Sequence, residues 1–425
     1  METYRKRIAD DLLVRKLATS GAVLVEGPKW CGKTTTAERA AASVLYMDEP
    51  KKKAQNVLLA KTSPDELLAG AAPRLIDEWQ LAPELWDAVR FSTDHSGGFG
   101  RFILTGSAVP ADSEAMSHSG TGRFSWLRMR PMTLWESGDS SGGLPLSALF
   151  DGTAPDAARA RPHELAAVAG LVCRGGWPQA IGLKDDLACD PSKNYVDAVA
   201  KKDISRVDGV ARDEDRARRL LRSYARLQGT QSSASVIRED LTSNEMVSFD
   251  DDTVYSYLNA LRKIFVVEDL PAWCPNLRSK DAVRTSDTRY FVDPSIATAA
   301  LGAGPRDLMG DLATFGLLFE TMAVRDLRVY MEALDGETRH YRDKSGLECD
   351  AVLHRRDGRY GLAEIKLGGD ALVEEGVASL SALAKLIAAK KMPQPAFRMV
   401  VTAVGDFAYR RPDGVWVCPL SALKP

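Results

Sequence analysis

Several features that would assign a class quickly are scarce in this 425-residue sequence. Its six cysteines are scattered and include no Cys-x-x-Cys pair, which argues against a disulfide framework and a zinc ribbon. Its five histidines are far apart, and no two have metal-ligand spacing. The 56 basic and 58 acidic residues give a net charge of −2. Any nucleic-acid binding must therefore come from a local patch.

Long apolar runs are also absent. No stretch approaches the roughly 20 apolar residues that a membrane span requires. The first residues, METYRKRIADDLLVRKL, lack the apolar core of a signal peptide. We therefore expect a cytoplasmic protein with no membrane partner, and the length predicts two to four domains.

A phosphate-binding loop is predicted near the N-terminus, in AVLVEGPKWCGKTTTAERAAA at 22–42. Two glycines bracket four residues, and Lys33 and Thr34 follow, between a strand and a helix. Glycines let backbone N–H groups approach phosphate oxygens, the lysine attracts the β- and γ-phosphates, and the threonine hydroxyl can ligate Mg²⁺. We expect ATP to bind at Gly27, Pro28, Lys29, Trp30, Cys31, Gly32, Lys33, Thr34 and Thr35.

Two further strands carry polar residues at their carboxyl ends. APRLIDEWQ at 72–80 places Asp77 and Glu78 after an apolar run. The first carboxylate can hold Mg²⁺ and the second can orient or deprotonate the attacking water. RFILTGSA at 101–108 ends with Thr105 and Ser107, in the position where parallel sheets bind ligands. Thr105 is a candidate γ-phosphate sensor; an ordinary turn is the alternative.

The first third of the chain predicts a parallel α/β sheet wrapped by helices. Arg123 follows a Gly-rich stretch and is a candidate arginine finger, with a plain surface arginine as the alternative. A role in trans would need a dimer or ring, so oligomerisation stays open. The predicted strands are 22–26, 44–48, 74–78, 101–106 and about 126–131.

These motifs in combination resemble a family. GPKWCGKTTT, RLIDEWQ, FILTGSA and GRFSWLRMRPMTLWE look like the ATPase domain of AAA-type proteins common in bacteria and archaea. In that family the ATPase is joined to a C-terminal domain of unknown function, and the resemblance extends to GGWPQA and KKDISRV. It implies ATP binding by Gly27–Thr34, with Asp77 for Mg²⁺ and Glu78 as the catalytic base.

The middle of the chain contains a predicted winged helix. Residues 137–160 are rich in Gly, Ser, Pro and Asp and are expected to be loop or linker. Helices are expected at 215–228, 233–241 and 252–263, followed by a hairpin of IFVVEDL with YFVDP. The last helix could enter a DNA groove. The acidic run 250–252 argues against close phosphate approach, so DNA contact and a packing or protein-binding role are equal alternatives.

A second candidate site lies in the hairpin LECDAVLHRRDGRYGLAEIKLG at 347–368. Alternation puts Glu364 and Lys366 on one face and Asp350 on the matching face of the preceding strand. For the apolar faces to coincide, Asp350 must lie opposite Glu364. The hairpin therefore needs an odd-length loop or a β-bulge instead of a two-residue Asp-Gly turn. Glu320 lies within a strongly apolar helix, which is costly unless it is paired or metal-bound.

This hairpin resembles the restriction-endonuclease superfamily motif D…ExK. The resemblance implies that Asp350, Glu364 and Glu320 bind Mg²⁺ and that Lys366 orients water and stabilises charge. The proline that often precedes the aspartate is absent, because Cys349 occupies that place. Many members of that superfamily keep the fold without activity, and a solvated Glu–Lys strand face is the alternative.

The sequence thus predicts an α/β protein with a P-loop AAA-type parallel sheet, a winged helix and a restriction-endonuclease-like α/β domain. We expect an Mg²⁺-dependent ATP-binding and ATP-hydrolysing protein whose C-terminal region binds or cleaves DNA. The alternative is a nucleotide-dependent switch that docks a protein partner through an inactive nuclease-like domain. The predicted parts are 1–136 for the ATPase, 137–214 for a linker and helical connector, 215–300 for the winged helix and 301–425 for the endonuclease-like domain.

Overall fold

The structure is a computed structural model that describes residues 4–107, 120–184, 187–274 and 286–425. The chain divides into two compact units. Unit 1 contains Met1–Pro131 and two returning segments, Val199–Asp213 and Tyr257–Val266. Unit 2 contains Met132–Ala198, Glu214–Ser256 and Val267–Pro425.

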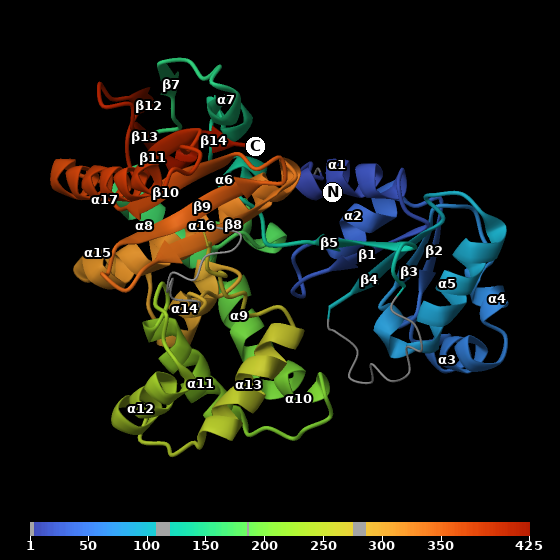
Figure 1. Cartoon of the computed structure of the whole chain (residues 1–425). Helices are drawn as coiled ribbons and strands as arrows, with labels where there is room; N and C mark the ends of the chain where they lie inside the picture. Colours follow the sequence, from blue (N-terminus) through green and yellow to red (C-terminus); the bar gives the residue numbers. More distant parts are fainter. Residues whose placement is uncertain (1–3, 108–119, 185–186, 275–285) are drawn as a thin grey trace. The chain divides into compact units, whose positions relative to one another are not determined.

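Unit 1 is built on a five-stranded parallel sheet of order β2-β3-β4-β1-β5 (Figure 1). The prediction of a parallel α/β sheet is therefore confirmed, with the last strand beginning slightly earlier than expected. The strands are β1 (Ala22–Glu26), β2 (Ser43–Tyr46), β3 (Arg74–Asp77), β4 (Phe102–Gly106) and β5 (Phe124–Arg128).

Helices cover both faces of this sheet because its central strands are apolar on both sides. Leu24, Ile76 and Leu104 pack on one face with Trp86 of α5. The odd-numbered apolar residues of the same three strands point to the other face, where they pack with α1 and α2. The helices of this unit are α1 (Ile8–Leu17), α2 (Lys33–Ala40), α3 (Lys53–Thr62), α4 (Pro64–Leu68), η1 (Trp79–Leu81), α5 (Glu84–Ser96), the π-helix η3 (Val199–Asp203) and α10 (Ile204–Arg206).

Unit 2 contains a seven-stranded mixed sheet of order β7-β12-β13-β11-β10-β9-β8. The long helix α16 (Leu312–Ala333) contacts β8, β9 and β10, and α17 (Asp370–Ala389) contacts β9, β10 and β11. The strands are β7 (Ala157–Arg159), β8 (Gly336–Arg342), β9 (Glu348–Arg355), β10 (Tyr360–Lys366), β11 (Phe397–Thr402), β12 (Phe407–Arg410) and β13 (Trp416–Pro419).

The expectation of plain loop over residues 137–160 is wrong. β7 joins the seven-stranded sheet by pairing with β12, and β6 (Leu144–Pro145) pairs with β14 (Leu423–Lys424). A short helix, α7 (Leu146–Asp151), lies between β6 and β7. Local composition favoured loop here because the strands are only two or three residues long and are stabilised by partners more than 240 residues away.

Three predicted helices lie in the middle of the chain, at α11 (Glu214–Arg226), α12 (Ala234–Asn244) and α13 (Asp251–Lys263). Antiparallel bridges join Val267 to Phe291 and Leu270 to Thr288, where the hairpin was expected. Among the residues that the structure describes, no helix is both long and apolar enough to cross a membrane. The remaining helices are α6 (Leu134–Ser137), α8 (Leu165–Arg174), η2 (Pro178–Ala180), α9 (Asp190–Ala198), α14 (Pro294–Leu301), α15 (Pro305–Gly310) and η4 (Leu420–Ala422).

Candidate functional sites

The loop between β1 and α2 has the backbone that a phosphate cradle requires. Gly27 has φ 150° and Gly32 has φ 98°, both in the region that favours glycine. A Cβ at Gly27 would lie 2.0 Å from the carbonyl oxygen of Met129, so the close approach of the residue that follows strand β5 also demands glycine there. Trp30 adopts φ 66° in the middle of the loop. The loop leads into the N-terminus of α2, where backbone N–H groups favour an anion.

Hydrogen bonds and one ion pair hold this loop and its side chains in place. Lys33 is buried, and its Nζ donates to the carbonyl oxygen of Pro28 at 2.8 Å. Arg7 donates to the carbonyl oxygen of Cys31 at 2.7 Å, which fixes the far side of the loop. Lys29 forms an ion pair with Asp203 at 2.6 Å. Thr35 is exposed on the first turn of α2. A lysine and a cradle of backbone groups are thus in place for a phosphate tail.

The predicted acidic pair lies beside this loop, at the end of β3. The Thr34 hydroxyl donates to Asp77 Oδ1 at 2.8 Å, and the Thr105 hydroxyl donates to the same oxygen. Burial raises the pKa of Asp77, and the two hydroxyl hydrogen bonds oppose that rise. Thr34 and Asp77 therefore form a set of oxygen atoms of the kind that Mg²⁺ prefers.

Glu78 follows in a left-handed backbone conformation, with φ 55°. Gln80 Nε2 donates to its carboxylate, and the Ser107 hydroxyl lies 3.4 Å from Oε2. Burial raises the pKa of Glu78, while Lys33 lowers it. A carboxylate of raised pKa held by two polar partners is a suitable general base. Sequence reasoning missed Gln80, which lies two residues after Glu78.

Arg123 does not lie at the P-loop of its own chain. It precedes β5, whose first residue pairs with Ala22 at the start of the parallel strand β1, whereas the P-loop follows the end of β1. Its side chain forms an ion pair with Asp94 at 2.6 Å. Arg123 therefore lies at the end of the parallel strands opposite to the P-loop. Its action as an arginine finger toward another subunit stays a prediction.

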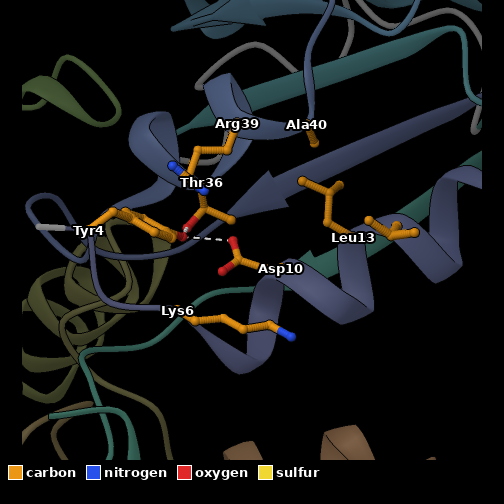
Figure 2. Close-up of a pocket in the computed structure, with 8 residues that line it drawn as sticks. Tyr4, Lys6, Asp10, Leu13, Thr36, Arg39 and Ala40 are labelled. Carbon is orange, nitrogen blue, oxygen red and sulfur yellow. Dashed lines mark hydrogen bonds between the residues drawn. The ribbon is translucent and has the colours of Figure 1, made fainter.

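A pocket of about 330 Å³ lies between α1 and α2 (Figure 2). The Tyr4 hydroxyl donates to Asp10 at 2.7 Å and lies 3.0 Å from the Thr36 hydroxyl, and the Arg39 guanidinium stacks on the Tyr4 ring. Burial and the hydrogen bond to Asp10 raise the pKa of Tyr4 to about 12. The pocket flanks the helix that follows the P-loop, and Leu13 and Ala40 add apolar surface to it.

In unit 2 the hairpin has the predicted register. Leu362 pairs with Val352 and Ala363 with Ala351, which places Asp350 opposite Glu364. The amide of Arg355 donates to the carbonyl oxygen of Arg359, so the loop has three residues, and Gly358 has φ 88°. The expectation of an odd-length loop is confirmed.

Of the four predicted residues of this site, Asp350 and Lys366 each lie within electrostatic reach of both Glu320 and Glu364. Burial and then the charge of Asp350 raise the pKa of both Glu320 and Glu364 well above the ordinary value. Burial also raises the pKa of Asp350, and Lys366 opposes it. Burial would lower the pKa of Lys366, but the carboxylates around it raise it. Lys366 Nζ lies 3.5 Å from Glu364.

Each carboxylate also has a neutral partner. The backbone amide of Ile365 donates to Asp350 at 2.7 Å, and the Ser379 hydroxyl donates to Glu364 at 3.2 Å. The Tyr290 hydroxyl donates to Glu320. Sequence reasoning missed Tyr290 and Ser379, because they come from the segment before α14 and from α17. In the described part of the chain, no group of three or more His, Cys, Asp or Glu side chains has the arrangement of a metal site.

The arginines of α11 are occupied within unit 2. Arg218 pairs with Asp197 and Glu214, and Arg226 pairs with Asp240 and Glu245. Arg222 also pairs with Glu245. On α13, Tyr255 and Asn259 are exposed. The arginine-rich helix therefore stabilises its own neighbours through ion pairs.

Comparison with known proteins agrees with the class that the P-loop defines. Residues 19–137 match the family model described as an AAA domain, so this part of the chain is a P-loop α/β domain of the AAA type, a class of nucleotide-binding ATPases. Residues 166–307 and 315–423 match two models described as domains of unknown function, DUF8612 and DUF4143.

Relatives and solved structures are distant. Uncharacterized proteins of Mycobacterium tuberculosis and Mycobacterium bovis are each 24% identical over 365 residues, which cover 85% of this chain and 74% of the relative. The Walker-type ATPase of Pyrococcus abyssi is 13% identical, with a TM-score of 0.42 over 70% of this chain and 96% of its own. The ORC1 protein of Aeropyrum pernix, solved with DNA, is 15% identical, with a TM-score of 0.24 over 71% of this chain and 93% of its own.

Proposed function

We propose that unit 1 binds ATP with Mg²⁺ and hydrolyses it. The observation that carries the proposal is the convergence of Thr34, Thr105 and Asp77 beside a glycine-bracketed loop that contains Lys33. The loop amides and Lys33 hold the phosphate tail, and Thr34 and Asp77 hold the metal ion, which neutralises charge on the phosphates. Glu78 accepts a proton from the attacking water, and Gln80 orients its carboxylate.

The test is phosphate release from ATP by the whole chain, with Mg²⁺ and with EDTA. We expect release only with Mg²⁺ and a loss of about 100-fold or more in Asp77→Asn. Asp65→Asn, at an exposed position on α4, is the matched control and should keep the wild-type rate. Equal rates with Mg²⁺ and EDTA, or an Asp77→Asn variant that keeps the wild-type rate, would refute the proposal.

A second activity, metal-dependent DNA cleavage, is proposed for unit 2. It is supported by Asp350 and Lys366, each of which acts electrostatically on both Glu320 and Glu364, and by the burial that destabilises the charged forms of all three carboxylates. The charged forms of such carboxylates become more stable when a cation binds beside them. In this role the carboxylates bind the cation, and Lys366 orients water toward the scissile phosphate.

Plasmid cleavage with Mg²⁺ or Mn²⁺, with and without ATP, tests this second activity. Lys366→Ala should abolish cleavage, whereas Lys385→Ala, exposed on α17, should not. Two outcomes would reject the proposed nuclease activity. One is cleavage that persists in Lys366→Ala, and the other is a wild type that shows no cleavage with either metal.

The alternative is a nucleotide-dependent switch in which unit 2 docks a protein. Helices α11–α13 with their antiparallel bridges support assignment as a winged helix. Arg218, Arg222 and Arg226 of α11 are already ion-paired, which reduces the positive charge that this helix offers to a DNA backbone. This observation favours protein docking over DNA contact at α11. Wild-type ATP hydrolysis without any plasmid cleavage would select the switch.

A further inference from the structure

The P-loop carries a second lysine whose partner comes from a distant part of the sequence. Lys29 Nζ lies 2.6 Å from Asp203 Oδ1. Asp203 is the last residue of the π-helix η3, in a returning segment that belongs to unit 1. The Asp203 side chain is 10% exposed and the Lys29 side chain is 44% exposed. Asp203 is therefore the more buried partner, and Lys29 has more room to reorient.

Lys29 lies inside the P-loop, between Gly27 and Gly32. The preceding residue, Pro28, accepts a hydrogen bond from Lys33 Nζ at 2.8 Å, so the segment that contains Lys29 adjoins the lysine assigned to the phosphate tail. In the proposed function this loop encloses the phosphates, and Lys29 would then be able to contact one of them.

The second returning segment contacts the same edge of the sheet. Arg128, at the end of β5, pairs with Glu26 at 2.6 Å and stacks 4.5 Å from the centroid of the Phe265 ring. Glu26 directly precedes the first glycine of the P-loop. Both returning segments of unit 1 therefore have a contact near the P-loop. Each is followed along the chain by residues of unit 2, which begin at Glu214 and at Val267.

We propose that Asp203 is a nucleotide-sensitive latch on the P-loop. Without nucleotide, the Asp203 carboxylate neutralises Lys29. A bound triphosphate carries more negative charge than one carboxylate, so it takes Lys29 as a phosphate ligand and releases Asp203 with the segment 199–207. A diphosphate lacks the terminal group and leaves the latch closed. This inference rests on the proposed nucleotide binding in unit 1 and deepens it by naming the residues that report the γ-phosphate.

The test measures dissociation constants of ATPγS and ADP for the whole chain with Mg²⁺. Asp203→Asn removes the competing charge and keeps the side-chain volume. It should tighten ATPγS binding about two- to fivefold, the range of a partly exposed ion pair, and should leave ADP binding unchanged. In a Lys29→Met background, Asp203→Asn should have no further effect.

The matched control is Asp208→Asn, in the same returning segment, because Asp208 pairs with Arg212 at 2.7 Å and not with the P-loop. It should keep the wild-type ratio of ATPγS to ADP affinity. A changed ratio in Asp208→Asn, an unchanged ratio in Asp203→Asn, or an equal effect of Asp203→Asn with and without Lys29 would overturn the latch.

Amide hydrogen exchange gives an independent readout. Exchange of residues 199–207 should rise when ATPγS binds the wild type, and should already be high without nucleotide in Asp203→Asn. Identical exchange with and without ATPγS would contradict the latch. A wild-type chain that binds neither nucleotide would instead refute the proposed function, so the two failures are distinguishable.

Discussion

The two candidate sites use the same residue types in opposite ways. At the P-loop, Asp77 is satisfied by hydroxyl groups of Thr34 and Thr105, and the cations belong to the loop itself. In unit 2, burial and the charge of Asp350 raise the pKa of Glu364, and both carboxylates raise the pKa of Lys366. We propose that the first arrangement binds an anion and the second a cation. The comparison suggests a general rule: the groups around a carboxylate, more than the carboxylate itself, indicate which ligand a site would bind.

The largest expected effect sharpens this comparison by removing one positively charged side chain from the P-loop. Lys33→Ala should lower ATP turnover about 10²- to 10³-fold, because the phosphate tail loses its buried positive charge. Metal-supported plasmid cleavage without ATP should stay at the wild-type rate. Lys51→Ala, at an exposed position, is the control. If Lys33→Ala lowers both activities equally, the two sites do not act separately and the comparison fails.

The next effect concerns the acid sensitivity of unit 2. His340 is buried; its Nε2 lies 3.0 Å from the carbonyl oxygen of Ser286, and Gln231 donates to Nδ1 at 3.2 Å. Burial lowers the pKa of His340 to about 4. Between about pH 6.5 and 4 only the unfolded chain takes up this proton, so the free energy of unfolding should fall by about 2–3 kcal/mol as the pH falls through that window.

Urea unfolding of unit 2 across this pH range measures the effect. His340→Gln should lose most of this pH dependence, and His95→Gln, exposed in unit 1, should keep it. A His340→Gln variant with the full wild-type slope would show that another group is responsible.

A smaller effect tests the mutual repulsion of the unit 2 carboxylates. Burial and Asp350 raise the pKa of Glu320, so its charged form destabilises the folded state at pH 8. Glu320→Gln removes the charge and keeps an oxygen for the Tyr290 hydroxyl. We expect the free energy of unfolding at pH 8 to be higher in Glu320→Gln than in the wild type, because the variant has no buried charge at this position. Glu239→Gln, exposed on α12, should change little, and a destabilised Glu320→Gln would contradict the interpretation.

The smallest effect concerns the hairpin that aligns Asp350 with Glu364. Gly358 has φ 88° and open space around its Cβ position, so only backbone strain opposes a side chain there. Gly358→Ala should destabilise unit 2 by about 1 kcal/mol. Gly170→Ala, inside helix α8 with equally open space, should be neutral or stabilising. Equal thermal shifts for the two variants would argue against the three-residue loop.

The sequence predicted the grouping of Thr34, Asp77 and Thr105 because these residues lie in a local motif or at strand ends of a parallel sheet. Strand ends in a parallel sheet meet at one edge, so Asp77 and Thr105 were expected beside Thr34, and their hydrogen bonds place them there. Asp203 and Gln80 were not singled out. Asp203 is more than 170 residues from Lys29, and no local pattern encodes that pairing.

The unit 2 cluster was predictable only in part. Alternation along two strands gave the register of Asp350 and Glu364, including the odd-length loop. The partners Tyr290 and Ser379 come from other elements, whose packing depends on the whole core. The loop expected over 137–160 was wrong for the same reason, since β7 is stabilised by β12. Where stability comes from distant partners, composition is a weak guide.

The most direct test of the central claim is the separation of ATP binding from turnover in Glu78→Gln. The account predicts Mg²⁺-dependent phosphate release by the wild type. It also predicts a Glu78→Gln variant that binds Mg²⁺-ATP within about threefold of the wild type but turns it over at least about 100-fold more slowly, because the proton acceptor is gone. Wild-type turnover in Glu78→Gln, or a wild-type chain that binds ATP and releases no phosphate, would contradict it.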